Sequence, residues 1–113
     1  MRECVELGCT PHGEECEQVG TADYSPVMAR AECRALINQM IRENPGLPAG
    51  VTFRVKGNSH DFGTYYEAQA CYDTMDDAAG EAAWGLESKL PEKWDDAARA
   101  ELEAARRAIG VSV

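Results

Sequence analysis

Apolar residues recur at helical spacing through the stretch YSPVMARAECRALINQMIRENPG, residues 24–46. Ser25 suits an N-cap, and Pro26 suits the first helical position, where its missing N–H costs nothing. The Asn-Pro-Gly sequence at 44–46 ends the helix, because proline cannot continue one. The pattern therefore predicts an amphipathic helix with one buried stripe, formed by Ala29, Cys33, Leu36, Ile37, Met40 and Ile41.

Two later segments alternate between apolar and polar residues, as strands do. They are VTFRVKG at 51–57 and GTYYEAQACYD at 63–73, joined by NSHDF at 58–62. This arrangement predicts an antiparallel hairpin with a long loop. An isolated hairpin is marginal in water, so it needs a helix packed on it or a further strand. The preceding helix supplies the first, and Glu3–Leu7 is a candidate third strand.

Two further helices are predicted after the hairpin. Thr74 and Asp77 have the spacing of a capping box, which predicts a helix over residues 75–88 with small inner residues. Asp95 can cap the last helix, and Gly110 can end it. The apolar stripe of this last helix is formed by Ala98, Leu102, Ala105 and Ile109.

These elements predict an α+β fold, in which an antiparallel hairpin packs against about three helices. The sheet has three strands if Glu3–Leu7 joins it. The 113 residues are expected to form a single compact domain, 1–113, and a chain of this size buries roughly 65% of its unfolded surface. Residues 1–24 are expected to be an irregular acidic segment apart from the candidate strand. Trp84 and Trp94, which flank the link between the last two helices, are expected in the core.

The net charge of −9 lies at the two ends of the chain. Residues 1–24 carry six acids and one base, residues 74–113 carry nine acids and five bases, and the middle is balanced. Direct binding to nucleic acid is unfavourable for such a chain, because phosphate contacts come largely from Lys and Arg. An acidic surface suits a basic protein partner and speeds encounter with it. Solubility alone is the alternative explanation of the charge.

The carboxylates predicted to bind this partner lie in the N-terminal segment and at two helix starts: Glu14, Glu15, Glu17, Asp76, Asp77, Asp95 and Asp96. No nucleophile elbow, phosphate-binding loop or dinucleotide fingerprint occurs, so we expect no enzyme. The Asp-Phe-Gly triplet at 61–63 holds magnesium in protein kinases, but the other kinase motifs are missing, and turn formation explains the segment. A catalytic pair of His60 and Asp61 is the remaining enzymatic hypothesis.

We expect a cytoplasmic protein that does not enter membranes. No apolar run approaches the roughly 20 residues needed to cross a bilayer, and the stretch MRECVELGCT lacks the apolar region of a signal peptide. In a reducing cytosol, cysteines are more often buried thiols or metal ligands than bridges. The chain has five cysteines, so at least one stays unpaired in any disulfide scheme. The sequence offers no partner for Cys4 or Cys71.

Cys9, His12 and Cys16 form the pattern C-x2-H-x3-C, and Cys33 is a candidate fourth ligand from the first helix. Zinc favours four such ligands in a tetrahedron, with short spacings inside one loop. Against zinc, Cys33 lies on the apolar stripe, where packing explains it, and only one tight group of ligands is present. Free thiols without a cofactor are the preferred interpretation. Zinc at these four residues and a Cys16–Cys33 bridge are the alternatives.

The segments VELGCTPHGEECEQVG, AECRALINQ, VKGNSHDFGTYYE and LPEKWDDAARAEL span most of the chain. They resemble a group of small acidic proteins of bacteriophages, prophages and related mobile elements, whose members are usually described as uncharacterised. In the family pattern Cys16, Cys33 and the loop at 60–63 have counterparts, whereas Cys9 and His12 occupy freer positions. The resemblance therefore weakens the case for zinc and implies a Cys16–Cys33 contact that ties the N-terminal segment to the first helix.

Small phage proteins without enzymatic motifs often act by occupying host machinery, and an acidic one is similar to anti-CRISPR and anti-restriction inhibitors. The resemblance implies a non-enzymatic accessory protein that binds and inhibits a basic, nucleic-acid-handling host protein, such as a CRISPR effector or another defence protein. The alternative is a small zinc- or disulfide-stabilised structural or interaction domain with no inhibitory role. The oligomeric state is left open.

Overall fold

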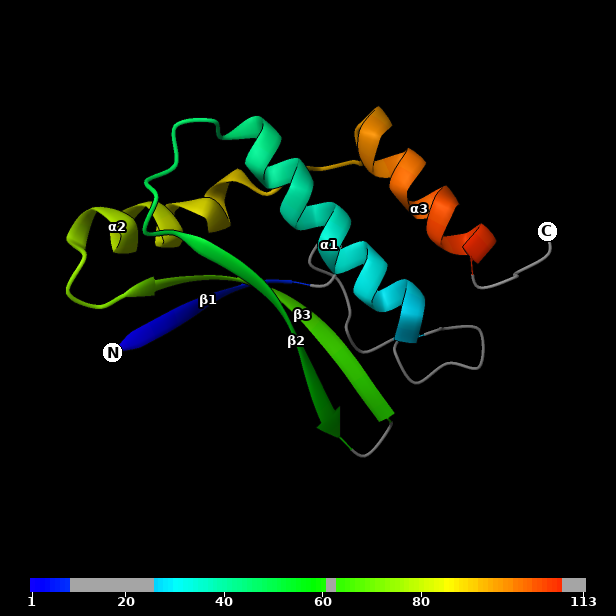
Figure 1. Cartoon of the computed structure of the whole chain (residues 1–113), viewed down its shortest axis with the longest axis horizontal. Coiled ribbons are helices and arrows are strands. Elements are labelled where there is room, and N and C mark those ends of the chain that lie inside the picture. Colours follow the sequence, from blue (N-terminus) through cyan, green and yellow to red (C-terminus); the bar gives the residue numbers. More distant parts are fainter. Residues whose placement is uncertain (9–25, 61–62, 109–113) are drawn as a thin grey trace.

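Three strands form one antiparallel sheet, and helices cover one of its faces, in the computed structural model of the chain (Figure 1). Residues 1–8, 26–60 and 63–108 are described. The elements follow in the order β1 (Arg2–Gly8), α1 (Pro26–Glu43), β2 (Thr52–His60), β3 (Gly63–Asp73), α2 (Asp77–Gly85), the 3-10 helix η2 (Leu86–Lys89) and α3 (Asp96–Ala108). The α+β prediction is confirmed, and the candidate third strand is β1.

The central strand of the sheet is β3, and the strand order is β1-β3-β2. A bulge interrupts the pairing of β1 with β3 between the pairs Glu6↔Gln69 and Gly8↔Ala68. Gly8 has a φ of 106°, a left-handed conformation that glycine adopts without steric cost and that is frequent at bulges. The bulge shifts the register before Gly8↔Ala68, the last described pair of β1 with β3.

The hairpin loop is shorter than the sequence predicts. Pairing between β2 and β3 continues from Lys56↔Glu67 to His60↔Gly63, so only residues 61 and 62 lie between the strands. The predicted loop over 58–62 is therefore wrong for its first three residues. Turn-forming residues accept strand geometry when a partner strand supplies their backbone hydrogen bonds.

Helix α1 packs on β3, whose face toward the helix carries small residues at its centre. Ala68 and Ala70 are 0% exposed, which lets the helix lie close to the strand. Ile41 is 45% exposed, so the last member of the predicted α1 stripe lies beyond the buried face of the helix. Larger side chains fill the space around the two alanines, among them Val5, Leu36, Met40 and Leu86.

Helix α3 packs on α1. Ala98 and Leu102 of α3 form a second, smaller apolar cluster with Ala35 of α1, and the half-buried Trp94 contacts both clusters. Asn38 strengthens the contact by donating from Nδ2 to the Glu101 carboxylate at 2.7 Å. None of the described helices is both long enough and apolar enough to cross a membrane.

The opposite face of the sheet is polar and carries a disulfide between Cys4 and Cys71. The two residues face each other across β1 and β3, with Cα atoms 4.0 Å apart, close to the spacing of a non-hydrogen-bonded antiparallel pair. The sequence alone predicts no partner for either cysteine, because the pairing of β1 with β3 brings together residues that are far apart in sequence. Cys33 is free and buried in the core, so the predicted Cys16–Cys33 bridge is not formed.

Removing the disulfide should lower stability strongly. The bridge joins residues with a sequence separation of 67, and in the chain-entropy account a loop of this size contributes about 4 kcal/mol. We expect the Cys4→Ala/Cys71→Ala variant to lose about 3–4 kcal/mol of unfolding free energy in urea titrations. A reducing agent should destabilise the wild-type protein to the same extent and leave the double variant unchanged. A wild-type midpoint that does not move on reduction would contradict the bridge.

Candidate interaction surface on α2

The acidic start of α3 is engaged by contacts within the chain. Asp95 caps the helix as predicted, its Oδ1 accepting the backbone N–H of Ala98 at 2.8 Å. The Arg42 guanidinium donates to both oxygens of this carboxylate at 2.8–3.2 Å, and these bonds hold the pKa of Asp95 below its ordinary value. Asp96 is exposed, but it accepts a hydrogen bond from Arg99 at 2.7 Å. Asp95 therefore joins α1 to α3, and Asp96 is paired with a cation of its own helix.

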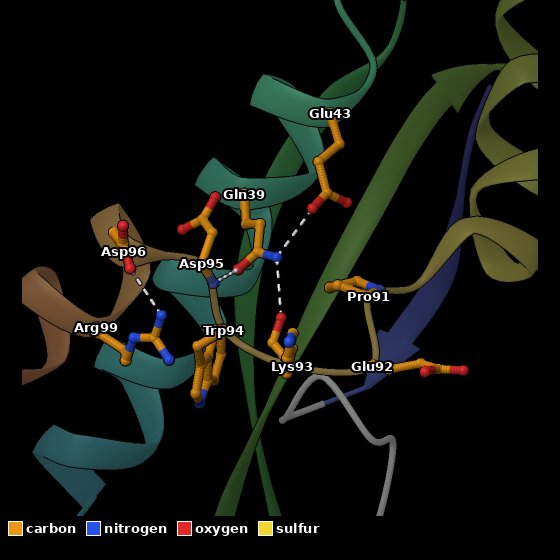
Figure 2. A pocket seen from close by; sticks show the side chains of 9 residues that line it. All are labelled: Gln39, Glu43, Pro91, Glu92, Lys93, Trp94, Asp95, Asp96 and Arg99. Carbon is orange, nitrogen blue, oxygen red and sulfur yellow. Dashed lines mark hydrogen bonds and ion pairs between the residues drawn. The ribbon is translucent and has the colours of Figure 1, made fainter.

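The hollow beside this helix start is built around a buried glutamine (Figure 2). It has a volume of about 460 Å³ and is lined partly by Gln39, Glu43 and Trp94. The Gln39 side chain, 1% exposed, donates to the Glu43 carboxylate at 3.0 Å and to the Lys93 carbonyl at 3.1 Å. Its Oε1 accepts the backbone N–H of Asp95 at 3.0 Å. Both N–H groups and the oxygen of the Gln39 amide are therefore hydrogen-bonded within the chain. This side chain connects α1 to the segment that leads into α3.

The acidic start of α2 is arranged differently. Asp76 is the N-cap and accepts the backbone N–H of Ala79 at 3.1 Å, so the predicted capping box at Thr74 is wrong. Thr74 instead extends the pairing with the first strand, because its N–H donates to the Met1 carbonyl at 2.8 Å. Asp77, one position after the cap, is exposed and forms no ion pair with any described residue.

Asp77, Glu81 and Trp84 lie on one flank of α2, because they are four and three positions apart. The buried side of the helix consists of Ala79, Gly80 and Ala83, and Gly80 adjoins this flank, three positions after Asp77 and four before Trp84. Trp84 is 54% exposed, so the prediction that it lies in the core is wrong. The inner side of α2 has no room for an indole, since a Cβ at Gly80 would lie 2.9 Å from the Tyr72 ring.

Two hydrogen bonds in series hold the exposed indole in one orientation. Nε1 of Trp84 donates to the Tyr72 hydroxyl at 2.8 Å, and this hydroxyl donates to Oε2 of Glu3 at 2.9 Å. The relay links α2, β3 and β1 through a tyrosine that is 7% exposed. A side chain that is already fixed loses little conformational entropy when a partner binds it.

The surroundings of this indole are acidic, with a second apolar side chain close to the helix start. Residues 73–88 contain five acids and no base, and Lys89, the next residue, lines a hollow with Glu81 without forming an ion pair to it. Met75, two positions before the helix, is 88% exposed. Aromatic and methionine side chains are enriched at the centres of protein interfaces, whose rims are polar. Met75, Asp77, Glu81 and Trp84 are referred to below as the α2 surface.

Two glutamates, Glu6 of β1 and Glu67 of β3, are neighbours on the polar face of the sheet. Glu67, 8% exposed, accepts a hydrogen bond from Nε2 of Gln69 at 3.1 Å, and Gln69 in turn accepts one from Nε of Arg54 at 2.7 Å. Burial raises the pKa of Glu6, and the neighbouring Glu67 carboxylate raises it further. The ionised form of Glu6 therefore opposes folding.

Several of the predicted site residues lie outside the described residues. They are the zinc ligands Cys9, His12 and Cys16 and the acids Glu14, Glu15 and Glu17. Asp61, the predicted catalytic partner of His60, lies outside them as well. Cys33 is buried, its thiol donates to the Tyr66 carbonyl at 3.4 Å, and burial raises its pKa to about 12. Zinc binds the thiolate, so this environment suits a packing residue. Across 1–8, 26–60 and 63–108, no group of three or more His, Cys, Asp or Glu side chains is placed to hold a metal.

No family model, curated protein or solved structure matches this chain. The resemblance to phage and prophage proteins therefore stays a prediction. The sequence carries a signal for the α2 surface. Trp84 is the single large apolar residue among the small ones of α2, and it follows Asp77 and Glu81 at positions i+7 and i+3.

Replacing Gln39 should weaken the contact between α1 and the segment before α3, and so lower the stability of the fold. Gln39→Met keeps the side-chain volume but leaves the N–H of Asp95 and the carbonyl of Lys93 without their side-chain partner. We expect a loss of about 2 kcal/mol of unfolding free energy in urea titrations, because buried polar groups are costly when unpaired. Asn38→Met, which removes one exposed hydrogen bond from the same helix, should lose less than about 1 kcal/mol. Equal losses in the two variants would contradict this role of Gln39.

Glu6→Gln should stabilise the protein at neutral pH. Because the pKa of Glu6 is raised by folding, the folded chain holds this proton more tightly than the unfolded chain. The gain from Glu6→Gln should be full above the raised pKa, shrink as the pH falls through it, and vanish below the ordinary value of 4.5. Urea titrations across this range measure the difference, with Glu103→Gln, an exposed acid 4.0 Å from Arg107, as the control without a gain. A gain independent of pH would contradict ionisation as its cause.

Proposed function

We propose that this protein is a non-enzymatic inhibitor that binds a basic, nucleic-acid-handling host protein through the α2 surface. The observation that carries the proposal is the exposed indole of Trp84, fixed by hydrogen bonds on a flank that is otherwise acidic. Inhibition here means that the protein covers the basic residues with which its partner holds nucleic acid.

The charges of Asp77 and Glu81 support a basic partner, because no described residue forms an ion pair with either of them. On α3, by contrast, Arg42 pairs with Asp95 and Arg99 pairs with Asp96. Two opposite unit charges 4 Å apart attract by about 1 kcal/mol in water and about 4 kcal/mol near a protein surface. An incoming Lys or Arg therefore gains more at α2 than at α3.

The apolar members of the surface support a protein partner rather than a small cation. Trp84 is 54% exposed and Met75 is 88% exposed, and both side chains gain free energy when a partner removes them from water. Carboxylates around such anchors steer a basic surface toward them and raise the association rate. The same carboxylates repel phosphate, which disfavours direct binding of nucleic acid.

The proposed setting is the cytoplasm of a bacterial host, in keeping with the resemblance to phage and mobile-element proteins. A CRISPR effector or another defence protein fits as the partner, because such proteins hold nucleic acid in positively charged channels. The proposal needs no catalytic residue and no cofactor, since occupation of the channel is enough to block it.

A second candidate function is a disulfide-stabilised interaction domain without an inhibitory role. The bridge between Cys4 and Cys71 favours this candidate, because disulfides persist mainly in oxidising compartments. The two functions differ in one measurable respect, which is whether the bound partner loses access to nucleic acid.

Charge reversal on the α2 surface should weaken partner binding. Asp77→Lys/Glu81→Lys is compared with the control Asp96→Lys/Glu103→Lys, which changes the net charge equally and also places one lysine in the first turn of a helix. From a bacterial lysate at low salt, the wild type and the control should retain a basic, nucleic-acid-binding protein. The α2 variant should bind it about tenfold more weakly or worse, because local charge complementarity is lost, and salt should weaken wild-type binding.

The captured protein is then purified, and its affinity for labelled nucleic acid is measured with and without the acidic protein. Loss of nucleic-acid binding supports inhibition. A ternary complex that still contains nucleic acid contradicts inhibition and supports the interaction domain. Equal capture by the two charge variants, or capture indifferent to salt, excludes the α2 surface as the binding site.

A further inference from the structure

We propose that Trp84 receives an arginine side chain of the partner. In this arrangement the guanidinium stacks on the exposed face of the indole, its N–H groups donate to the carboxylate of Glu81 one turn away, and the charge of Asp77 one turn further adds to the attraction. The inference rests on the proposed function, because it names the chemical group that the α2 surface takes.

The part of Trp84 that a partner can contact is the π face of its ring, because its polar group is already hydrogen-bonded. The only polar atom of a tryptophan side chain is Nε1, which is a donor, and here it already donates to the Tyr72 hydroxyl. The exposed half of the side chain is therefore carbon surface, with negative potential over the ring. A cation is the ligand that such a face attracts, and tryptophan is the strongest aromatic side chain for this interaction.

The relay behind the indole strengthens this attraction. Hydrogen bonds in series polarise one another, and this series runs from Trp84 through Tyr72 to the carboxylate of Glu3. An indole that donates toward an anion through an intervening hydroxyl carries more electron density on its ring. The relay thus does two things, since it fixes the ring in place and makes it a better acceptor for a cation.

The cation position over this ring is not filled from within the described part of the chain. There the recorded cation–π contact is that of Arg30 over Tyr66, 5.6 Å from the ring centroid. Asp77 and Glu81 stand seven and three positions before Trp84 on the same flank, without an ion pair to a described residue. The aromatic face and the two carboxylates are therefore available together to a group from outside.

Arginine fits an aromatic face beside carboxylates better than other side chains that could contact Trp84. Its planar guanidinium stacks on an aromatic ring while the N–H groups at its edge remain free to reach carboxylates. A lysine ammonium is a compact point charge without a stacking plane. An apolar side chain would cover Trp84 but would remove the nearby carboxylates from water without a partner, which is costly.

The test uses three synthetic peptides of glycine alternating with arginine, lysine or citrulline, titrated into the full chain and followed by proton NMR. Citrulline keeps the shape of arginine without its charge. On binding of the arginine peptide, its δ-methylene protons should shift upfield, since protons above an aromatic ring are shielded. The arginine peptide should bind about tenfold more weakly to Trp84→Leu, in line with a partly desolvated cation–π contact, and Trp84→Phe should keep part of the affinity and part of the upfield shift.

The upfield shift is measured on the wild-type protein, so the test holds even if a variant folds poorly, and thermal unfolding checks each variant. Saturable binding without the shift overturns the inference, as does equal affinity for wild type and a folded Trp84→Leu. If either result is found but Asp77→Asn/Glu81→Gln still weakens binding of the peptide, the carboxylates bind it without the indole, and the proposed function stands. If that variant binds the peptide as well as the wild type, the proposed function fails too. Equal affinity for the lysine or citrulline peptide also overturns the choice of arginine.

Discussion

The pairing of β1 with β3 is the interaction on which the rest of the structure depends. It turns a hairpin of marginal stability into a three-stranded sheet and places Cys4 opposite Cys71, where the disulfide forms. The same register sets Glu3 opposite Tyr72 on the other face, and so supplies the acceptor that completes the relay from Trp84. A slip of one residue in β1 would turn its side chains to the opposite faces of the sheet. The bridge and the relay would then be lost together.

Small residues decide where α2 lies, and its position decides what the helix leaves outside. Ala79 and Ala83 are 0% exposed, and Gly80 lies so close to Tyr72 that even a Cβ would crowd the ring. A nine-residue helix with such an inner side buries little apolar surface of its own, and isolated helices of this length are unstable. Its stability comes from the Asp76 cap and from packing on the sheet. The large side chain of this helix is therefore left for the outer flank, where Trp84 lies.

Much of the fold follows from sequence periodicity, because α1 carries a long stripe with clear end signals and the strands of the hairpin alternate. The features that sequence did not predict are set by tertiary partners. The hairpin loop is short because residues 58–60 find partners in β3, and α2 begins after Asp76 because the N–H of Thr74 is bound to Met1. The bridge between Cys4 and Cys71 requires the register of two strands that are distant in sequence.

The predicted acids show why composition can locate a charged surface but cannot assign roles within it. Asp76 and Asp95 are both N-caps, and capping requires the same residue type at a helix start as binding of a basic partner does. The residue after each cap has its carboxylate free of backbone hydrogen bonds, so Asp77 and Asp96 occupy equivalent positions.

These two acids differ in what stands three residues later on the same face of the helix. After Asp96 this residue is Arg99, which pairs with it at 2.7 Å; after Asp77 it is Gly80, where the Tyr72 ring leaves no space for a side chain. The close packing of α2 on β3 therefore removes the cation that would neutralise Asp77, and the same contact orients Tyr72 beneath the indole of Trp84. One packing constraint thus leaves an unpaired acid and a fixed aromatic ring on the same flank.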